Sequence, residues 1–229
     1  MLGTSLTVPL ARAQSYCASD GQARPTLLLE RFINADCAEC WSAAATPALP
    51  RGGLVLDWVV PGNKGDDAPL AAVASRDALT RLQALGQEPQ AGQWQQSMSM
   101  AAAKATEKRH ASAYRLRASH GLAFNGYVGV SLELKPLPVQ SPARQDGPWT
   151  AWLALVEAVP AGTEGSPVDR QLVRNVLVVP WSRQQAGGLE RRSMALPEGS
   201  NPDRISVVAW LEDSRHGLKT AVQSRCAER

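Results

Sequence analysis

Two cysteines three positions apart, Cys37 and Cys40, are the group in this sequence with the best-defined chemistry. A Cys-x-x-Cys pair is typical of thiol–disulfide exchange, in which one thiolate attacks a disulfide and the second thiol resolves the mixed disulfide. The pair directly follows a compact apolar run at residues 26–33 and precedes an alanine-rich stretch at residues 41–46. This order predicts a buried strand, then a helix that starts at the cysteines and whose free N–H groups stabilise a thiolate on Cys37.

The charged neighbours of the pair have the opposite effect on that thiolate. Asp36 and Glu39 place two carboxylates beside Cys37, and nearby negative charges disfavour a further one. A less favoured dithiol form makes the disulfide resist reduction. The sequence therefore leaves two roles open for Cys37 and Cys40: a redox pair with the properties of a reductant, or a stable structural disulfide in a non-enzymatic envelope protein that serves as a binding or scaffold protein.

Metal binding is a third chemistry open to two thiolates. Together with His110 or His120, Cys37 and Cys40 would offer suitable ligands to zinc or copper(I). A closed zinc site needs a full tetrahedral ligand set, and the sequence has no second Cys-x-x-Cys and no paired-histidine motif. We therefore predict neither a metal nor another cofactor.

The use of cysteine predicts an oxidising compartment. The chain has four cysteines, an even number, and the remaining two are Cys17 and Cys226. Three pairings are possible, and sequence alone does not choose between them. The economical pairing joins Cys37 to Cys40 and Cys17 to Cys226, which ties the two ends of the mature chain together.

The first residues favour export. Residues 2–10 are mostly apolar, and Ala-Arg-Ala at 11–13 supplies small residues where a signal peptidase cleaves. The basic start of a signal peptide is missing, so residues 1–15 are either the remnant of a longer signal, which we favour, or a disordered N-terminus. We expect a periplasmic or secreted protein.

The hydrophobic pattern changes near Gly121. Before it, a second apolar run at residues 54–60 completes a strand–helix–strand unit, and helices are predicted at 75–85 and 97–118. After it, alternating apolar residues predict strands, at 127–134, 149–158, 172–181, 205–211 and 218–224. We expect an α/β thioredoxin-like domain over residues 16–121, followed by an antiparallel β-sandwich domain over residues 122–229.

Other partners and activities find no support in the sequence. The net charge of +3 is small and evenly spread, which argues against nucleic acid as a partner. No run approaches the roughly 20 apolar residues that a membrane-spanning helix needs. The sequence has no nucleophile elbow, phosphate loop, dinucleotide fingerprint or zinc-protease motif.

Residues 28–41 (LLERFINADCAECW) resemble an uncharacterised secreted bacterial family with a thioredoxin-like fold, whose members read V-E-L-F-T-S-x-G-C-x-x-C-P at this point. The match covers Glu30, Phe32 and both cysteines of the motif. The resemblance extends loosely over most of the mature chain and implies a thioredoxin-like fold. It is compatible with thiol–disulfide exchange on envelope proteins that carry thiols or disulfides, with Cys37 attacking and Cys40 resolving.

This sequence departs from the family pattern at several positions. Trp41 replaces the proline after the second cysteine, and Asn-Ala-Asp at 34–36 replaces the residues usual before the motif. Thioredoxin-like enzymes also carry a cis-proline beside the cysteines, just before the third core strand. Pro89 is the candidate in the right region, where it would help to hold the substrate, and no recognisable strand pattern follows it.

Overall fold

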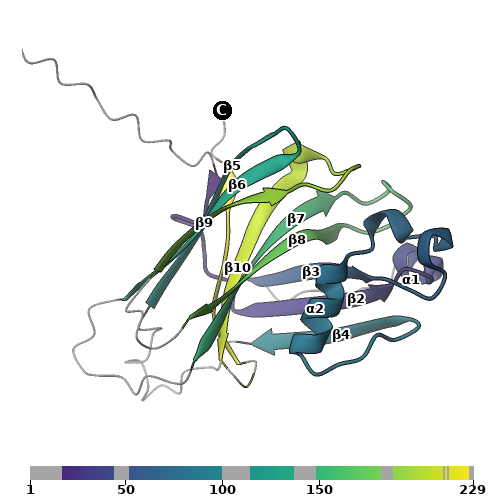
Figure 1. Ribbon diagram of the computed structural model, residues 1–229, viewed down its shortest axis with the longest axis horizontal. Helices are drawn as coiled ribbons and strands as arrows, with labels where there is room; N and C mark the ends of the chain where they lie inside the picture. Colours follow the sequence, from purple (N-terminus) through teal and green to yellow (C-terminus); the bar gives the residue numbers. More distant parts are fainter. Residues whose placement is uncertain are drawn as a thin grey trace, which may run out of the picture.

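The computed structural model describes residues 17–43, 52–99, 114–136, 148–181, 188–213, 215 and 217–226. The predicted signal-peptide remnant, residues 1–15, lies outside them. Strands dominate the described chain, which contains only two α-helices. Figure 1 shows two twisted sheets, a larger one that carries the helices and a smaller one on the left. The fold is mostly β, with fewer helices than the sequence predicts.

The helices are α1 (Ala38–Ser42) and α2 (Arg76–Ala84). The strands, in chain order, are β1 (Cys17–Ala18), β2 (Leu27–Asn34), β3 (Gly53–Val60), β4 (Gln93–Ser99), β5 (Tyr114–Phe124), β6 (Tyr127–Pro136), β7 (Trp149–Val159), β8 (Arg170–Trp181), β9 (Gly188–Ala195), β10 (Ile205–Asp213), β11 (Leu218–Gln223) and β12 (Arg225–Cys226). Short 3-10 turns are η1 (Gly65–Asp67), η2 (Ala71–Val73) and η4 (Pro202–Arg204). The seven-stranded sheet has the order β11-β10-β7-β8-β3-β2-β4, and the five-stranded sheet has the order β12-β1-β5-β6-β9.

The predicted strand–helix–strand unit around the cysteines is confirmed. β2 and β3 pair in parallel over their whole length, from Leu27 opposite Gly53 to Asn34 opposite Val60. Both strands lie inside the sheet and are mostly buried on both faces, which agrees with their high content of apolar residues. The chain passes from β2 into α1, so the cysteine motif lies at the carboxyl end of an interior strand, next to the edge strand β4.

The helix predicted at residues 75–85 is also confirmed, as α2. The side chain of Ser75 caps it by accepting a hydrogen bond from the N–H of Asp77 at 3.1 Å. Ala78 and Leu82 are buried in the core beneath the helix. α2 leads into β4, which pairs antiparallel with β2 on the side away from β3. A strand therefore does follow Pro89.

The helix predicted at residues 97–118 is wrong at both ends. Residues 97–99 belong to β4, residues 114–118 belong to β5, and residues 100–113 lie outside the described chain. In β4, Trp94 and Met98 contact the core, whereas Ser97 and Ser99 are exposed. The helix propensity of this segment is a weak preference, and backbone pairing with β2 overrides it.

The five strands predicted after residue 121 are present as β6, β7, β8, β10 and β11. Five strands were not predicted: β4 and β5, which overlap the ends of the helix predicted at 97–118, and β1, β9 and β12. β1 and β12 have two residues each, too few to show a pattern. β9 is an edge strand whose Glu190, Arg191 and Arg192 are at least partly exposed, so it lacks the alternation that marks a half-buried strand.

Strands from both halves of the chain form one sheet. β3 pairs in parallel with β8 through Asp57 opposite Leu172. The boundary expected near Gly121 falls inside β5, where His120 pairs with Val130 of β6. The strands on either side of the cysteine motif, β2 and β3, therefore belong to the same seven-stranded sheet as β7, β8, β10 and β11.

Each face of the seven-stranded sheet has its own core. On the face covered by α2, Trp58, Trp152 and Trp210 are at most 2% exposed. On the other face, alternate residues of β7 and β10, such as Leu153 and Val207, pack against the inner residues of the five-stranded sheet. A mixed seven-stranded sheet thus packs against an antiparallel five-stranded sheet, and both sheets draw strands from the two halves of the chain.

A buried ion cluster fixes α2 on the sheet. The guanidinium of Arg81, fully buried, contacts Glu30 of β2 at 2.8 Å and Glu212 of β10 at 2.6 Å. It also lies over the rings of Trp152 and Trp210, 4.5 and 5.4 Å from their centroids. Contact with two carboxylates raises the pKa of Arg81 well above its ordinary value, although burial acts to lower it. Arg81 therefore stays protonated and connects β2 with β10 through its two ion pairs.

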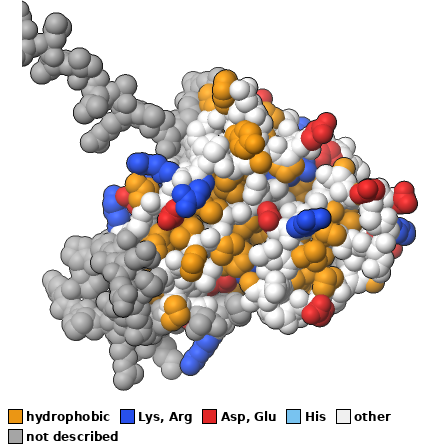
Figure 2. Space-filling model, in the orientation of Figure 1, with side chains coloured by type: hydrophobic (Ala, Val, Ile, Leu, Met, Phe, Trp, Pro, Cys, Tyr) orange, Lys and Arg blue, Asp and Glu red, His pale blue; other side chains and the backbone are white. Residues whose placement is uncertain are grey.

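The surface mixes apolar and charged side chains. Figure 2 shows hydrophobic side chains that reach the surface over the sheets, with acidic and basic side chains scattered among them. Leu122, Phe124 and Tyr127, around the β5–β6 turn, are the most exposed large hydrophobic residues described, at 64%, 76% and 52%. None of the described helices has the length and apolarity to cross a membrane.

Candidate functional site

Cys37 and Cys40 form a disulfide at the carboxyl end of β2, with their Cα atoms 5.3 Å apart. Cys37 is the N-cap residue of α1, and Cys40 lies within the helix. The two cysteines differ in exposure: Cys37 is 6% exposed, whereas Cys40 is partly open to solvent. In this geometry Cys40 is the more accessible of the two cysteines.

Hydrogen bonds fix the turn that leads into the motif. The side chain of Asn34 accepts from the N–H of Asp36 at 2.9 Å, and its amide donates to the carbonyl of Gln90 at 2.9 Å. The N–H of Cys37 donates to the carbonyl of Asn34 at 3.0 Å. Asn34 therefore connects the cysteine turn to the loop before β4.

The carboxylate of Asp36 is used structurally. It accepts hydrogen bonds from the N–H groups of Asn63 at 2.8 Å and Lys64 at 3.3 Å. A Cβ atom at Gly62 would overlap this carboxylate, so the close approach requires glycine there. Asp36 thus ties the turn after β3 to the cysteine motif, and these N–H groups offset part of the negative charge beside Cys37.

Trp41 anchors α1 in the core. It is 4% exposed and packs with Ile33, Val59 and Leu172, and its indole N–H donates to the carbonyl of Glu164 at 2.7 Å. Trp41 thus gives the short helix a large apolar anchor on the later part of the chain.

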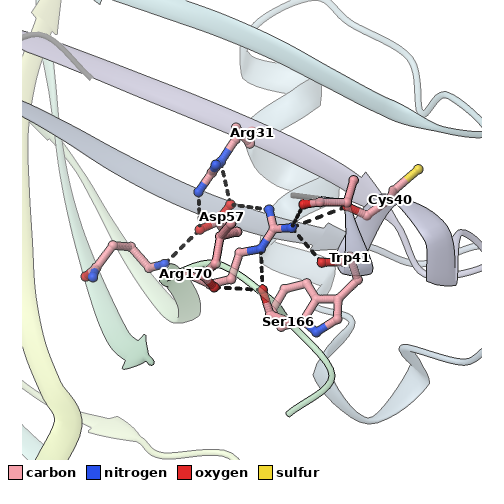
Figure 3. A network of polar contacts seen from close by, with 9 residues as sticks. Arg31, Cys40, Trp41, Asp57, Ser166 and Arg170 are labelled. Atoms are coloured by element: carbon pink, nitrogen blue, oxygen red, sulfur yellow. Dashed lines mark hydrogen bonds and ion pairs between the residues drawn. The ribbon is translucent and has the colours of Figure 1, made fainter. Parts of the chain in front are cut away.

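Arg170 of β8 donates hydrogen bonds to the carboxyl-terminal end of the same helix. Its Nη2 donates to the carbonyl of Trp41 at 2.6 Å and, at 3.4 Å each, to those of Cys40 and Ala43. Its guanidinium lies 5.1 Å from the ring centroid of Trp41. Figure 3 shows these contacts, with the sulfur of Cys40 pointing away from them. The last carbonyls of α1 therefore have a cationic partner from a strand far along the chain.

Arg170 belongs to a buried cluster with Arg31 and Asp57 (Figure 3). Arg31 makes a two-pronged contact with the Asp57 carboxylate, with distances of 2.7 and 2.8 Å, and Arg170 Nη1 lies 3.7 Å from it. All three side chains are at most 2% exposed. Burial lowers the pKa of Arg170, and the charge of Asp57 acts against this shift. The negative charge of Asp57 thus stabilises the buried guanidinium of Arg170, which contacts α1.

The cluster was missed in the sequence, although a signal for it exists. Arg31 and Asp57 each interrupt a run of apolar residues, at 27–33 and 54–60. A charged residue inside a strand buried on both faces needs a partner of opposite charge. The register that places Arg31 directly opposite Asp57 was not available from the sequence.

Pro89 lies in an exposed position in the loop between α2 and β4. The bond from Asn34 to the carbonyl of Gln90 brings this loop to the cysteine turn. No peptide bond in the described residues is cis. Pro89 is therefore next to a residue that is hydrogen-bonded to the cysteine turn, and its part in binding a substrate remains a prediction.

Cys17 and Cys226 form the second disulfide, between β1 and β12. The economical pairing of the four cysteines is thus the one observed. Of the histidines considered as metal ligands, His120 lies in β5 beside Cys17, and His110 lies outside the described residues. His120 therefore belongs with the second disulfide and not with the first.

Comparison with known proteins gives one structural likeness of use. The solved structure of HBP35 of Porphyromonas gingivalis, a thioredoxin-like haem-binding protein, is similar to this chain with a TM-score of 0.50 and 12% sequence identity. The similarity covers 89% of this chain and 76% of that one. No protein-family model matches the sequence, and no curated protein does. At this identity the likeness is one of fold, and the chain has an HBP35-like fold that carries a Cys-x-x-Cys disulfide.

Proposed function

We propose that the protein exchanges disulfides with other extracytoplasmic proteins, and that it does so through the sulfur of Cys40. The observation that carries the proposal is the unequal exposure of the pair, with Cys37 buried and Cys40 partly open to solvent. An attacking thiolate must reach the sulfur with which it reacts. Access therefore reverses the roles that the motif alone predicts for Cys37 and Cys40.

The reaction follows from this access. A thiolate of a partner protein attacks Cys40 Sγ, the Cys37–Cys40 bond breaks, and Cys37 leaves as a thiolate that takes up a proton. A second partner thiolate then attacks the mixed disulfide and releases Cys40. The partner loses two electrons and becomes a disulfide, while Cys37 and Cys40 gain them. The reverse sequence reduces a partner disulfide.

The compartment is part of the proposal. Both cysteine pairs of the chain are disulfides, which persist in oxidising compartments and are rare in the cytosol. The fold is like that of HBP35, a likeness compatible with an extracytoplasmic location. The partners that we propose are envelope or secreted proteins with accessible thiols or disulfides.

The direction of exchange depends on the reduction potential. Asp36 and Glu39 flank Cys37 with negative charge, which disfavours a thiolate there and makes the dithiol form the less stable one. We therefore expect a reductant, with a potential near that of thioredoxin at about −270 mV and far from that of a strong oxidant at about −120 mV.

A structural disulfide is the second candidate, and a specific observation favours it. Cys37 is 6% exposed, and Trp41 and Arg170 hold α1 firmly on the later strands. In this alternative the bond between Cys37 and Cys40 only closes the turn after β2. Its potential would lie below about −300 mV, as it does for structural disulfides.

Trapping of partner proteins outside the cytoplasm distinguishes the two candidate functions. In Cys37→Ser, the remaining Cys40 forms a mixed disulfide that no neighbouring thiol resolves, so partner adducts accumulate on non-reducing gels. In the matched Cys40→Ser variant, the buried Cys37 traps far fewer. Adducts with neither variant, together with a potential below about −300 mV, are the result expected for the structural alternative and would exclude exchange.

A further inference from the structure

Three residues of metal-ligating type lie in a row across the strands that hold the chain ends. In the five-stranded sheet, Cys17 of β1 is directly opposite Cys226 of β12 on one side and directly opposite His120 of β5 on the other. Directly opposite residues of antiparallel strands project on the same face with neighbouring Cβ atoms. The two sulfurs and a ring nitrogen of His120 all lie within 4.8 Å of one another.

His120 is arranged as a metal-binding histidine is. It is 5% exposed, its Nδ1 lies 2.9 Å from the carbonyl oxygen of Gly121, and its Nε2 is buried without a hydrogen-bond partner. A carbonyl oxygen only accepts hydrogen bonds, so Nδ1 carries the proton and Nε2 keeps its lone pair. Burial lowers the pKa of His120, which favours this neutral form. A backbone carbonyl that fixes one ring nitrogen while the other binds the ion is the common pattern around metals.

We propose that reduction of the Cys17–Cys226 disulfide converts these three residues into a binding site for zinc or a similar thiophilic divalent ion. A dithiol reductant supplies two electrons, the bond between the sulfurs breaks, and each sulfur takes up one proton. The ion then displaces both protons and binds two thiolates and the His120 imidazole. Three protein ligands leave a further coordination position free, and Cys226 is exposed, which gives the ion a route in.

The site is thus a second way to hold β1 and β12 together. Disulfide and metal exclude each other, because both use the sulfurs of Cys17 and Cys226. The neutral His120 has no proton on Nε2 to donate to a leaving thiolate, so it suits a metal ion better than it suits a second exchange reaction. This inference does not depend on the function proposed for Cys37 and Cys40.

Differential alkylation of the full chain tests the site, with Cys37 and Cys40 as an internal control. All four thiols are reduced with a phosphine, which is then removed, and N-ethylmaleimide is added with or without Zn²⁺. Peptide masses then report the modification of each cysteine. We expect Zn²⁺ to protect Cys17 and Cys226 at one ion per chain and to leave the control pair unprotected. Equal protection of all four thiols, or of the control pair alone, would overturn the proposal.

A histidine variant and a coloured probe make the assignment specific. His120→Phe keeps a ring of similar size in β5 and removes the ligand. Loss of a residue that only supports a ligand weakens metal affinity by roughly 10–100-fold. Loss of the ligand itself should therefore raise the Zn²⁺ concentration needed for protection by at least that factor. Co²⁺ in place of Zn²⁺ should give thiolate charge-transfer absorption with the reduced wild type and none with the oxidised wild type, whose fold is intact. Identical Co²⁺ spectra and affinities for reduced wild type and His120→Phe would exclude His120 as a ligand and refute the site.

Discussion

Replacement of Arg170 by methionine tests how α1 is held. The variant keeps an apolar stem of similar length but loses the guanidinium that donates to the carbonyl of Trp41 at 2.6 Å and lies 5.1 Å from its ring centroid. A hydrogen bond with a charged partner contributes about 1.5–3 kcal/mol and a buried cation–π contact about 0.5–2 kcal/mol. Asp57 keeps its two-pronged contact with Arg31, so no buried carboxylate is stranded. We expect a loss of about 2–5 kcal/mol of unfolding free energy, measured in urea.

The variant should also open the site. Because α1 carries Cys40, its release from β8 should speed reduction of the Cys37–Cys40 disulfide by a small dithiol in the absence of denaturant. If about 1.4 kcal/mol of the loss falls on local opening of α1, the rate rises about tenfold. Free thiols are counted by alkylation and mass spectrometry at fixed times. Arg170→Lys, which keeps a charge without the planar fork, should lie between the wild type and methionine.

Arg81→Met is the matched control for this prediction. It removes a guanidinium that is as deeply buried, but this guanidinium contacts two buried carboxylates, those of Glu30 and Glu212. Removal of one side of a buried ion cluster costs about 3–5 kcal/mol, so this variant should be the less stable of the two. Its Cys37–Cys40 disulfide should nevertheless be reduced at nearly the wild-type rate. Equal acceleration in both arginine variants, or none in Arg170→Met, would refute a specific role for Arg170 in holding α1.

Two further predictions concern local structure near and far from the cysteines. Gly62→Ala should cost about 1–3 kcal/mol of unfolding free energy, because its Cβ overlaps the Asp36 carboxylate. The control Gly92→Ala, with open space around its Cβ, should stay within about 0.5 kcal/mol of wild type. Similar unfolding free energies for the two variants in urea would contradict the overlap. For Asp213, burial acts to raise the pKa, but contact with Lys219 and two backbone N–H groups outweighs it, so the pKa lies below the ordinary 3.8. Its stabilising contribution is complete above pH 3.8 and is lost as the pH falls through the folded-state value. The difference in melting temperature between wild type and Asp213→Asn should therefore shrink on acidification below pH 3.8, and a constant difference would rule out this carboxylate as the cause.

The sequence predicts the elements whose pattern is local. β2 and β3 are apolar runs bounded by turn residues, and α2 has both an apolar stripe and a capping serine, Ser75. β4 escaped prediction because Trp94 and Met98 are separated by polar residues, and an edge strand gains its stability from the neighbouring backbone. Tertiary pairing decides such segments, and no local signal reports it.

In the candidate site, too, the features set by local sequence could be predicted, and those set by tertiary contacts could not. The cysteine spacing and its place between a strand and a helix are visible in the sequence, and so is the even cysteine count that predicts disulfides. The exposure of Cys40 relative to Cys37 is not visible, because it depends on Trp41 and on Arg170, which lies 130 residues beyond Cys40. The row of Cys17, His120 and Cys226 is hidden for the same reason, since only the strand register brings the three together.

The identity of the sulfur that is attacked first tests the central claim most directly. The oxidised protein is mixed briefly with glutathione, quenched with acid, alkylated, and digested for mass spectrometry. Access to solvent predicts that glutathione is found on Cys40 and the alkylating label on Cys37. Glutathione mainly on Cys37 would contradict the account, because it would show that the buried sulfur is the reactive one.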